Sequence, residues 1–489
     1  MRSLLAAMAA ALLAGAIVSL TPIASAQVLD EPSPEAPAPP PPPFAPRPLT
    51  IGETLRAAFY GNPDLLNQND ALLTARVAER GVASLFQPQV TPFFNTLRVQ
   101  GNGVRAQQYG VTATQQFSFG PLLEGSAVVT RAPTGSTDDR YASGYSISLS
   151  QPLLGGADPA VTREPLREAR RDVDTQIRSL EVLRRRTVLL IYQLYLGLAR
   201  QQEAARLAND RMDRAHKLAQ FSEARFLAGG VSRLDVLRAE QQLASAEVDR
   251  NDAWNLAEDL RDQLRRAAGL AAQFDFTILA PEEIPGSEPE LDAALSSIGS
   301  RRPEAIEAQE QVQDSRFAVR IAKSLELPSL DGVLSYEAAG AGQSVGDALP
   351  SRQSAFLFGF RSRYGLNHTA LAAQRREAEI ALATRERNYK LLEDDLARDV
   401  RRAYRRLEAE RQNEAIASEN LKVAELQAKV ARLRFEKGLS DNFNVVDADN
   451  LWNSARLLEL DSRINILLAQ LDCLYASGML EIGTFLQQP

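Results

Sequence analysis

The chain has 489 residues, of which 45% are hydrophobic and 24% charged, close to the average of folded proteins. The formal net charge is −7, which argues against a general nucleic-acid binder because such proteins carry a basic surface. The single cysteine, Cys473, excludes an intramolecular disulfide, and its apolar helical surroundings predict a buried thiol.

The N-terminal 26 residues have the pattern of a signal peptide. Arg2 precedes an apolar segment from Leu4 to Leu20, and Ala24-Ser25-Ala26 fits a cleavage site before Gln27. A membrane anchor is the alternative, because the apolar segment is only slightly shorter than a spanning helix. After residue 27 no apolar run reaches spanning length, so we expect any membrane crossing to use β-strands.

A Pro-rich linker is predicted over residues 27–49. Ten prolines fall between residues 31 and 48, which favours an extended polyproline conformation without a packed core. At roughly 3 Å per residue this segment could reach about 55 Å. We interpret it as a spacer, with a docking motif as the alternative.

An internal repeat organises the rest of the chain. Residues of the first copy match those 240 positions later, as Pro63 matches Pro303 and Pro88 matches Pro328, and a second block matches at an offset of 209. Repeat 1 is predicted over residues 50–280 and repeat 2 over residues 281–489. Each copy begins with a short helix, breaks before Pro63 or Pro303, and continues as a longer helix that ends at the second proline.

Alternating sequences predict β-strands at about residues 90–152 in repeat 1 and about residues 330–364 in repeat 2. Apolar residues alternate with polar ones at Tyr109, Val111, Ala113, Phe117 and Phe119, at Tyr145, Ile147 and Leu149, and at Phe356, Phe358 and Phe360. Gly, Ser, Asp and Pro are frequent in residues 101–110, 133–144 and 338–353, which predicts turns and loops there.

A long helical hairpin follows each strand region, at about residues 158–269 and 367–478. Asp158-Pro159 is a favourable helix start, and the reversals are expected at Gly229-Gly230 and Gly438. Apolar residues at spacings of three and four, such as Leu396, Val400, Ala403 and Leu407, indicate a coiled-coil seam. Helices this long cannot share one compact core, so we expect them to lie side by side.

This arrangement resembles the TolC-like outer-membrane efflux family, over about residues 50 to 480. Ser148 to Gly156 is similar to the family's segment between a strand and the long helix. Phe226-x-x-Gly229 with Asp235-Val236 is similar to its periplasmic tip, and Phe435-x-x-Gly438 with Asn444-Val445 to the second copy of that tip. The expected fold is mainly α, with an α-barrel of coiled-coil hairpins and a β-barrel that oligomerisation closes.

The resemblance implies a homotrimer in the outer membrane with a large periplasmic part. Each protomer would give four strands to a twelve-stranded barrel in outer-membrane lipid. The trimer would be the exit duct of a tripartite efflux or type I secretion system, opened by a periplasmic adaptor and served by a proton-driven or ABC inner-membrane pump. From the residues alone, about four strands cannot close a barrel, since natural barrels need about eight, so some oligomer is required.

The same resemblance assigns the candidate site residues. The adaptor-contact tips would be Phe226, Gly229, Gly230, Phe435, Gly438 and Leu439, and the periplasmic constriction would be Asp235, Asn444 and Asp447. The family often has an aspartate where this chain has Asn444, and TolC has a basic gate residue where this chain has Ser440. Helix capping is the alternative role of Asp235 and Asp447.

Signals for an enzyme are weak. The two histidines, His216 and His368, have no partner at metal-ligand spacing, and we expect neither a cofactor nor a metal. The alternative function is a periplasmic coiled-coil scaffold or adaptor without a barrel, which explains the long helices but not the alternating strands. The sequence does not identify the exported cargo.

Overall fold

The computed structural model describes residues 47–98, 105–133, 139–278, 284, 290–348, 353–365, 367–437, 439–440 and 442–486. The predicted signal peptide, most of the Pro-rich linker and Gly438 lie outside these residues. Within the described ranges, no helix is both long and apolar enough to cross a membrane.

Two short helices are each followed by a longer one. Helix α2 (Ile51–Gly61) precedes α3 (Pro63–Ala83) and the short 3-10 helix η1 (Ser84–Phe86), and α6 (Leu291–Arg301) precedes α7 (Pro303–Glu326). The breaks fall at the expected prolines, and the side chain of Asn62 accepts the first N–H groups of α3. The order helix, helix, strands, helical hairpin occurs twice, while the repeat itself stays a prediction.

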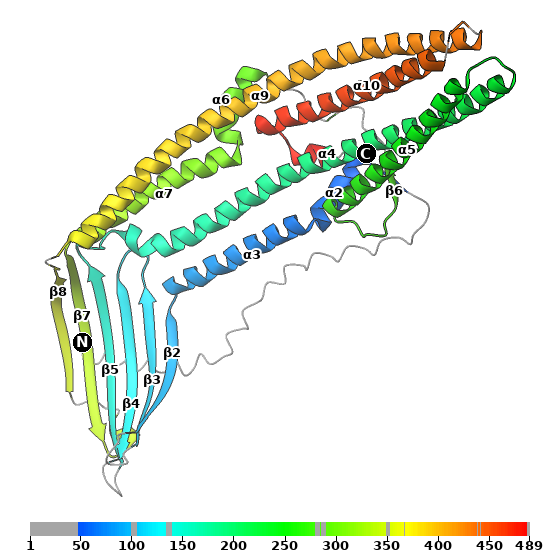
Figure 1. Cartoon of the computed structure of the whole chain (residues 1–489). Helices are drawn as coiled ribbons and strands as arrows, with labels where there is room; N and C mark the ends of the chain where they lie inside the picture. Colours follow the sequence, from blue (N-terminus) through cyan, green and yellow to red (C-terminus); the bar gives the residue numbers. More distant parts are fainter. Residues whose placement is uncertain are drawn as a thin grey trace. The chain divides into compact units, whose positions relative to one another are not determined.

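Six antiparallel strands form one sheet in the order β2-β3-β4-β5-β7-β8 (Figure 1). Strands β2 (Gln89–Arg98), β3 (Arg105–Gln116), β4 (Leu122–Pro133) and β5 (Asp139–Pro152) lie between α3 and the first long helix. Strands β7 (Ser329–Gly342) and β8 (Gln353–Arg363) follow α7, with the short α8 (Val345–Ala348) between them. A separate two-stranded sheet pairs β1 (Arg47–Leu49) with β6 (Phe276–Ile278).

Several expectations about the strands were wrong in detail. Phe117 and Phe119 lie in the turn after β3 and not in a strand, because the chain reverses at Gly120, whose φ is +128°. Three segments expected as loops contain strand residues instead, at 105–110, 139–144 and 338–342. The loops predicted from turn-forming residues were too long, because Gly and Ser also fit inside a strand that is paired on both sides. Six strands are present in the described part of the chain, and not the four that the resemblance implied.

The sheet has one apolar and one polar face, which the register of its strands fixes. In β3 to β5, Val111 lies opposite Ala127 and Ala127 opposite Tyr145, while the next row joins Thr112, Ser126 and Ser146. The pattern continues to the edge strand β8, where Tyr336 of β7 pairs with Phe356. Aromatic side chains there are largely exposed, with Phe356, Phe358 and Phe360 at 64%, 70% and 66%.

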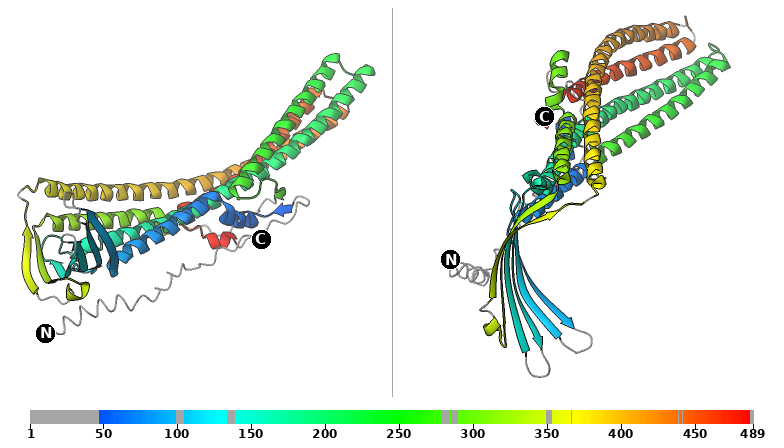
Figure 2. Two further views of the ribbon diagram at one scale, coloured as in Figure 1. Left: turned by 90° about the horizontal axis from the view of Figure 1, so that it is seen from below. Right: turned by 90° about the vertical axis from the view of Figure 1, so that its left-hand side faces the viewer.

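Two long helical hairpins make up most of the remaining chain (Figures 1 and 2). Helix α4 (Pro159–Leu227) packs along α5 (Arg233–Ala267), and α9 (Thr369–Glu436) packs along α10 (Asn442–Ala476). Asp158 caps α4 by accepting from the N–H of Ala160 at 2.9 Å, as its sequence predicted. Figure 1 shows both hairpin turns at the end away from the six-stranded sheet.

The hairpins are held by heptad-spaced seams. On α9 the buried positions are Leu396, Val400, Ala403, Leu407, Ala417, Ala424, Ala428 and Phe435. The first four confirm the predicted seam, and the alanines that follow allow close approach of the facing helix. Cys473, 1% exposed, is buried on α10 as expected.

A larger core lies where the helices pass the two-stranded sheet. Tyr192 and Tyr195 of α4 are fully buried there with Leu55 and Phe276, and Phe485 of the short α11 (Ile482–Leu486) packs edge-on against Tyr192. The hydroxyl of Tyr195 donates to the carbonyl of Leu49 at 2.8 Å. This core anchors the middle of α4, so the ends of the hairpins can differ in stability from their centre.

Candidate functional site at the hairpin tips

The first tip is a tight reversal built on a left-handed glycine. Gly229 has a φ of +75°, and its N–H donates to the carbonyl of Phe226 at 2.9 Å. The N–H of Gly230 donates to the carbonyl of Arg225 at 2.8 Å. These two bonds close the end of α4 as a Schellman motif, in which glycine is strongly favoured.

The second tip has the same hydrogen bond between residues five positions apart. The N–H of Leu439 donates to the carbonyl of Arg434 at 2.9 Å, 209 residues after the matching bond of Gly230 and Arg225. Gly438, the expected turning residue, lies outside the described residues. Leu439 takes the position that Gly230 has in the first tip.

The predicted tip residues differ in exposure. Leu439 is 75% exposed and Phe226 is half-buried beneath the guanidinium of Arg233. Phe435 is only 7% exposed, with its ring 5.6 Å from that of Phe221 in α4. Phe435 therefore holds the two hairpins together, and a contact with another protein would fall on the exposed residues. Leu227, 78% exposed beside Gly229, is one that the sequence reasoning did not select.

Two of the three predicted constriction residues are engaged at helix starts. The carboxylate of Asp235 accepts from the backbone N–H of Ser232 at 3.0 Å and from its hydroxyl at 2.7 Å, in a capping box. These hydrogen bonds hold the pKa of Asp235 below its usual value. The side-chain amide of Asn444 donates to Ser440 Oγ at 3.0 Å. Asp447 is exposed on the next turn of α10.

A row of ion pairs joins α4 of the first hairpin to α10 of the second. We call it the inter-hairpin ladder, and its members are Arg200 with Asp461, Glu203 with Arg456, and Arg214 with Asp449. Each rung places a residue of the first hairpin against one about 250 positions later. The ladder is thus a direct electrostatic link between the two hairpins.

Asp449 has the most contacts of the residues in the ladder. Its carboxylate accepts from Arg432 Nη2 at 2.5 Å and lies 3.6 Å from Arg214 Nε, while Arg214 Nη2 donates to Asn453 at 3.0 Å. Trp452 lies beneath both guanidiniums, at 5.3 Å and 5.4 Å. Burial lowers the pKa of Arg214 despite Asp449, and the nearby charge of Arg432 adds to that lowering.

A cavity of about 490 Å³ lies beside this rung, between the hairpins, with Phe221 and Phe435 in its wall. Three buried nitrogen atoms of the described residues in this region have no hydrogen-bond partner: Arg211 Nε, Arg214 Nε and Asn453 Nδ2. Unsatisfied buried groups of this kind carry a free-energy cost. The closed seam is therefore less stable here than in the core around Tyr192.

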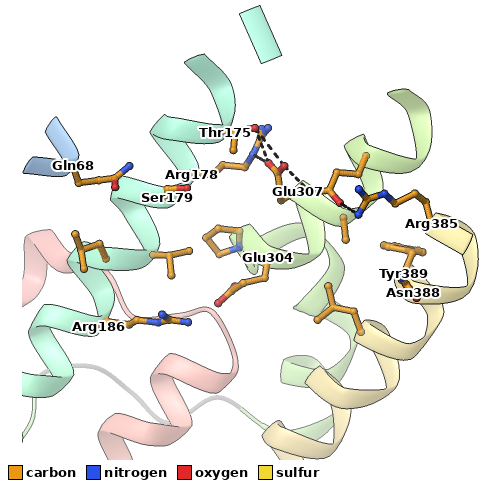
Figure 3. A pocket seen from close by; sticks show the side chains of 16 residues that line it. Gln68, Thr175, Arg178, Ser179, Arg186, Glu304, Glu307, Arg385, Asn388 and Tyr389 are labelled. Atoms are coloured by element: carbon orange, nitrogen blue, oxygen red, sulfur yellow. Dashed lines mark hydrogen bonds and ion pairs between the residues drawn. The ribbon is translucent and has the colours of Figure 1, made fainter. Parts of the chain in front are cut away.

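A second cavity, of about 590 Å³, lies between α4, α7 and α9 (Figure 3). Arg178 donates to Glu307 at 2.7 Å and pairs with Glu310 at 2.6 Å. Gln311 donates to Glu307 at 3.0 Å and accepts from Arg385 at 3.1 Å. Burial raises the pKa of Glu307, but the hydrogen bonds from Gln311 and Arg178 outweigh it and hold that pKa below its usual value. Since these charged side chains pair with one another, we interpret the cavity as part of the packing contact between the helices.

A family model and solved structures match the chain. The model of the outer membrane efflux protein family matches residues 294–476. The match covers the second half of the chain, from α6 to the end of α10. The predicted resemblance to an outer-membrane efflux family is thereby confirmed. No curated protein matches the chain.

The fold extends over the length of known channels. The Campylobacter jejuni CmeC outer membrane channel is 14% identical, with a TM-score of 0.69 and 89% of each chain covered. The outer membrane protein VceC of Vibrio cholerae is 14% identical, with a TM-score of 0.68, 88% of this chain and 96% of that chain covered. The open-state MtrE channel of Neisseria gonorrhoeae is 15% identical, with a TM-score of 0.62 and 88% of each chain covered. At these identities the likeness establishes the fold of the chain and nothing more.

Proposed function

We propose that this chain is one protomer of a trimeric outer-membrane exit duct for a tripartite efflux or type I secretion system. A periplasmic adaptor would open its helical end, and a proton-driven or ABC pump would supply the energy. The cargo would pass through the duct without chemical change.

The sheet is the observation that carries this proposal. Its apolar face fits lipid, its polar face fits a water-filled lumen, and strands of 10 to 14 residues match the length that crosses a membrane. Among the strands that the structure describes, β2 and β8 are the two edges, and each pairs with one other strand. Open edges in lipid leave backbone groups unsatisfied at several kcal/mol each, so copies must join edge to edge.

The helices supply a second contact between copies. Five apolar residues of α9 repeat at heptad spacing and are 41–63% exposed: Ile416, Val423, Leu426, Val430 and Leu433. A seam of this kind, open to water in one chain, fits the hairpin of a neighbouring copy. Helical contacts would then continue the ring that the strands begin.

At the other end, the tips are the proposed adaptor contact. Leu227 and Leu439 present exposed apolar side chains at the two turns, and Gly229 and Gly230 allow a close approach of backbone. Asp447 is the remaining candidate for a constriction, because it is exposed whereas Asp235 and Asn444 are bonded to their own turns. An acidic ring there would favour cations.

Two neighbouring residues test the proposal. Phe358 lies on the apolar face of β8 and Leu357 on the polar face. Phe358→Arg should impair insertion, since an arginine facing lipid costs about 2–4 kcal/mol at the membrane midplane, while Leu357→Arg should be tolerated. Outer-membrane fractions are assayed for heat-modifiable oligomers and for conductance in planar bilayers. A water-soluble monomer without detergent, or equal behaviour of the two variants, would contradict the duct and favour a periplasmic scaffold.

A further inference from the structure

The first half of the chain carries two β-hairpins where the second half carries one. In the described residues, β2 to β5 lie between α3 and α4, whereas β7 and β8 alone lie between α7 and α9. The additional pair is the hairpin of β3 and β4, residues Arg105–Pro133, which enters the sheet between β2 and β5. The family resemblance implied four strands per copy, so the role of the additional hairpin has to be explained separately.

The additional strands have the dimensions of their neighbours. Strands β3 and β4 have 12 residues each. Strands β5 and β7, which would cross the membrane whether a copy contributes four strands or six, have 14. A membrane-crossing strand needs about 9–11 residues. Strand β3 pairs with β4 over ten residues, from Gln107 with Arg131 to Gln116 with Leu122. The hairpin therefore crosses the full width of the sheet.

Both faces of the sheet continue without a break through these strands. On the apolar face Phe94 of β2 lies opposite Tyr109, which lies opposite Val129. On the polar face Thr91, Thr112 and Ser126 form one row, and Ser126 shares a hydrogen bond of 2.8 Å with Ser146 of β5. A hairpin that left the membrane would have no reason to keep this alternation in register with both neighbours.

The turn that joins β3 to β4 is fixed to the helical side of the sheet. The side-chain amide of Gln116 donates to the carbonyls of Phe117, Gly120 and Pro121 at 3.3, 2.9 and 3.1 Å. Arg163, in the first turns of α4, donates to the carbonyl of Ser118 at 2.8 Å. The ring of Phe119 is 56% exposed at this turn, the position at which aromatic residues border the membrane in barrels.

We propose that both hairpins of the first half cross the outer membrane, so that each copy contributes six strands to the wall. This rests on the proposed function, and three copies would then close a ring of eighteen strands with β2 of one copy against β8 of the next. With strands about 4.8 Å apart and tilted by about 40°, the backbone diameter is about 36 Å, against about 24 Å for twelve strands. The membrane end of the duct is then wide, and the narrowest passage lies in the helices.

Spin labels at paired positions test this assignment in liposomes of outer-membrane phospholipid. Val111→Cys and Ala127→Cys place a label on the apolar face of the additional hairpin, and Thr112→Cys and Ser126→Cys place it on the polar face. Ile147→Cys and Ser148→Cys on β5 are the matched controls. The native Cys473 is buried and stays unlabelled. We expect collisions with oxygen to dominate at 111, 127 and 147, and collisions with a water-soluble nickel chelate to dominate at 112, 126 and 148.

The controls separate the two proposals. If 147 and 148 alternate but 111 and 127 are reached mainly by the nickel chelate, the six-strand wall is wrong and the duct stands with four strands. If 147 and 148 also fail to alternate, the duct itself is wrong.

Discussion

Removal of the charge at Asp449 should favour separation of the two hairpins near their tips. Asp449→Asn keeps the size of the side chain, so the packing around Trp452 is preserved while both ion pairs lose their acceptor charge. Asp449 is 16% exposed, and its partners Arg214 and Arg432 are 27% and 39% exposed. The two guanidiniums that remain then repel each other without a counter-charge.

The magnitude follows from these distances and exposures. At 3.6 Å from Arg214 the gross attraction is about 4–5 kcal/mol at an effective dielectric constant near 20. Desolvation and solvent screening at this partly buried site reduce the net effect to about 1–2 kcal/mol. Because 1.4 kcal/mol is a factor of ten in an equilibrium constant, the ratio of open to closed states should rise about 5- to 30-fold.

Single-channel recording in planar bilayers measures this ratio as the open fraction of the purified oligomer. Arg214→Gln and the double variant complete a double-mutant cycle, in which the two changes should be strongly non-additive. Glu419→Gln is the matched control, because Glu419 pairs only at an exposed site with Lys422 of its own helix. An open fraction in Asp449→Asn equal to that of Glu419→Gln would refute the role of the ladder as a latch.

Three further predictions concern the tips and the joint between helices. Gly229→Pro should abolish export, because proline cannot adopt the φ of +75° at this turn. Export is measured in a complemented deletion strain. The trimer should still form, and normal export would contradict the tip role. Asp447→Ala should weaken the block of single-channel current by multivalent cations, whereas an unchanged block would remove Asp447 from the constriction. Glu307 has a lowered pKa, so its contribution to stability is complete above the usual glutamate pKa of about 4.3 and is lost as the pH falls through its folded pKa. Glu307→Gln should therefore lower the thermal midpoint at pH 7 by the equivalent of about 2 kcal/mol and converge with the wild type as the pH falls through the folded pKa of Glu307; a difference that does not change with pH would contradict the assignment.

Much of the helical architecture could be predicted from local sequence. Asp158-Pro159 marks the start of α4, and Leu396, Val400, Ala403 and Leu407 mark the buried seam of α9, because capping and heptad spacing are local properties. The turn at Gly229 was predictable for the same reason, since a glycine pair between two helical patterns favours a left-handed C-cap.

The remaining features depend on contacts that local sequence does not determine. Asp449 and Arg214 are 235 positions apart, and each looks like an ordinary surface charge on a long helix until the two hairpins are packed together. The number of strands was missed because Leu122–Pro133 interrupts its apolar row with Gly125, which lies between Ala113 and Ile147 of the neighbouring strands. Pairing partners, and not side-chain period, define that strand.

The two edges of the six-stranded sheet are chemically unlike each other, since β2 contains Pro92 and β8 contains three phenylalanines. Each contact between copies therefore joins β2 of one copy to β8 of the next, and each copy that joins a growing arc leaves the same pair of unlike edges at its ends. Every arc short of the complete circle exposes as much unbonded backbone as a lone chain does. Assembly is accordingly expected to be all-or-none, with no long-lived dimer, and its rate should depend steeply on the local abundance of the chain.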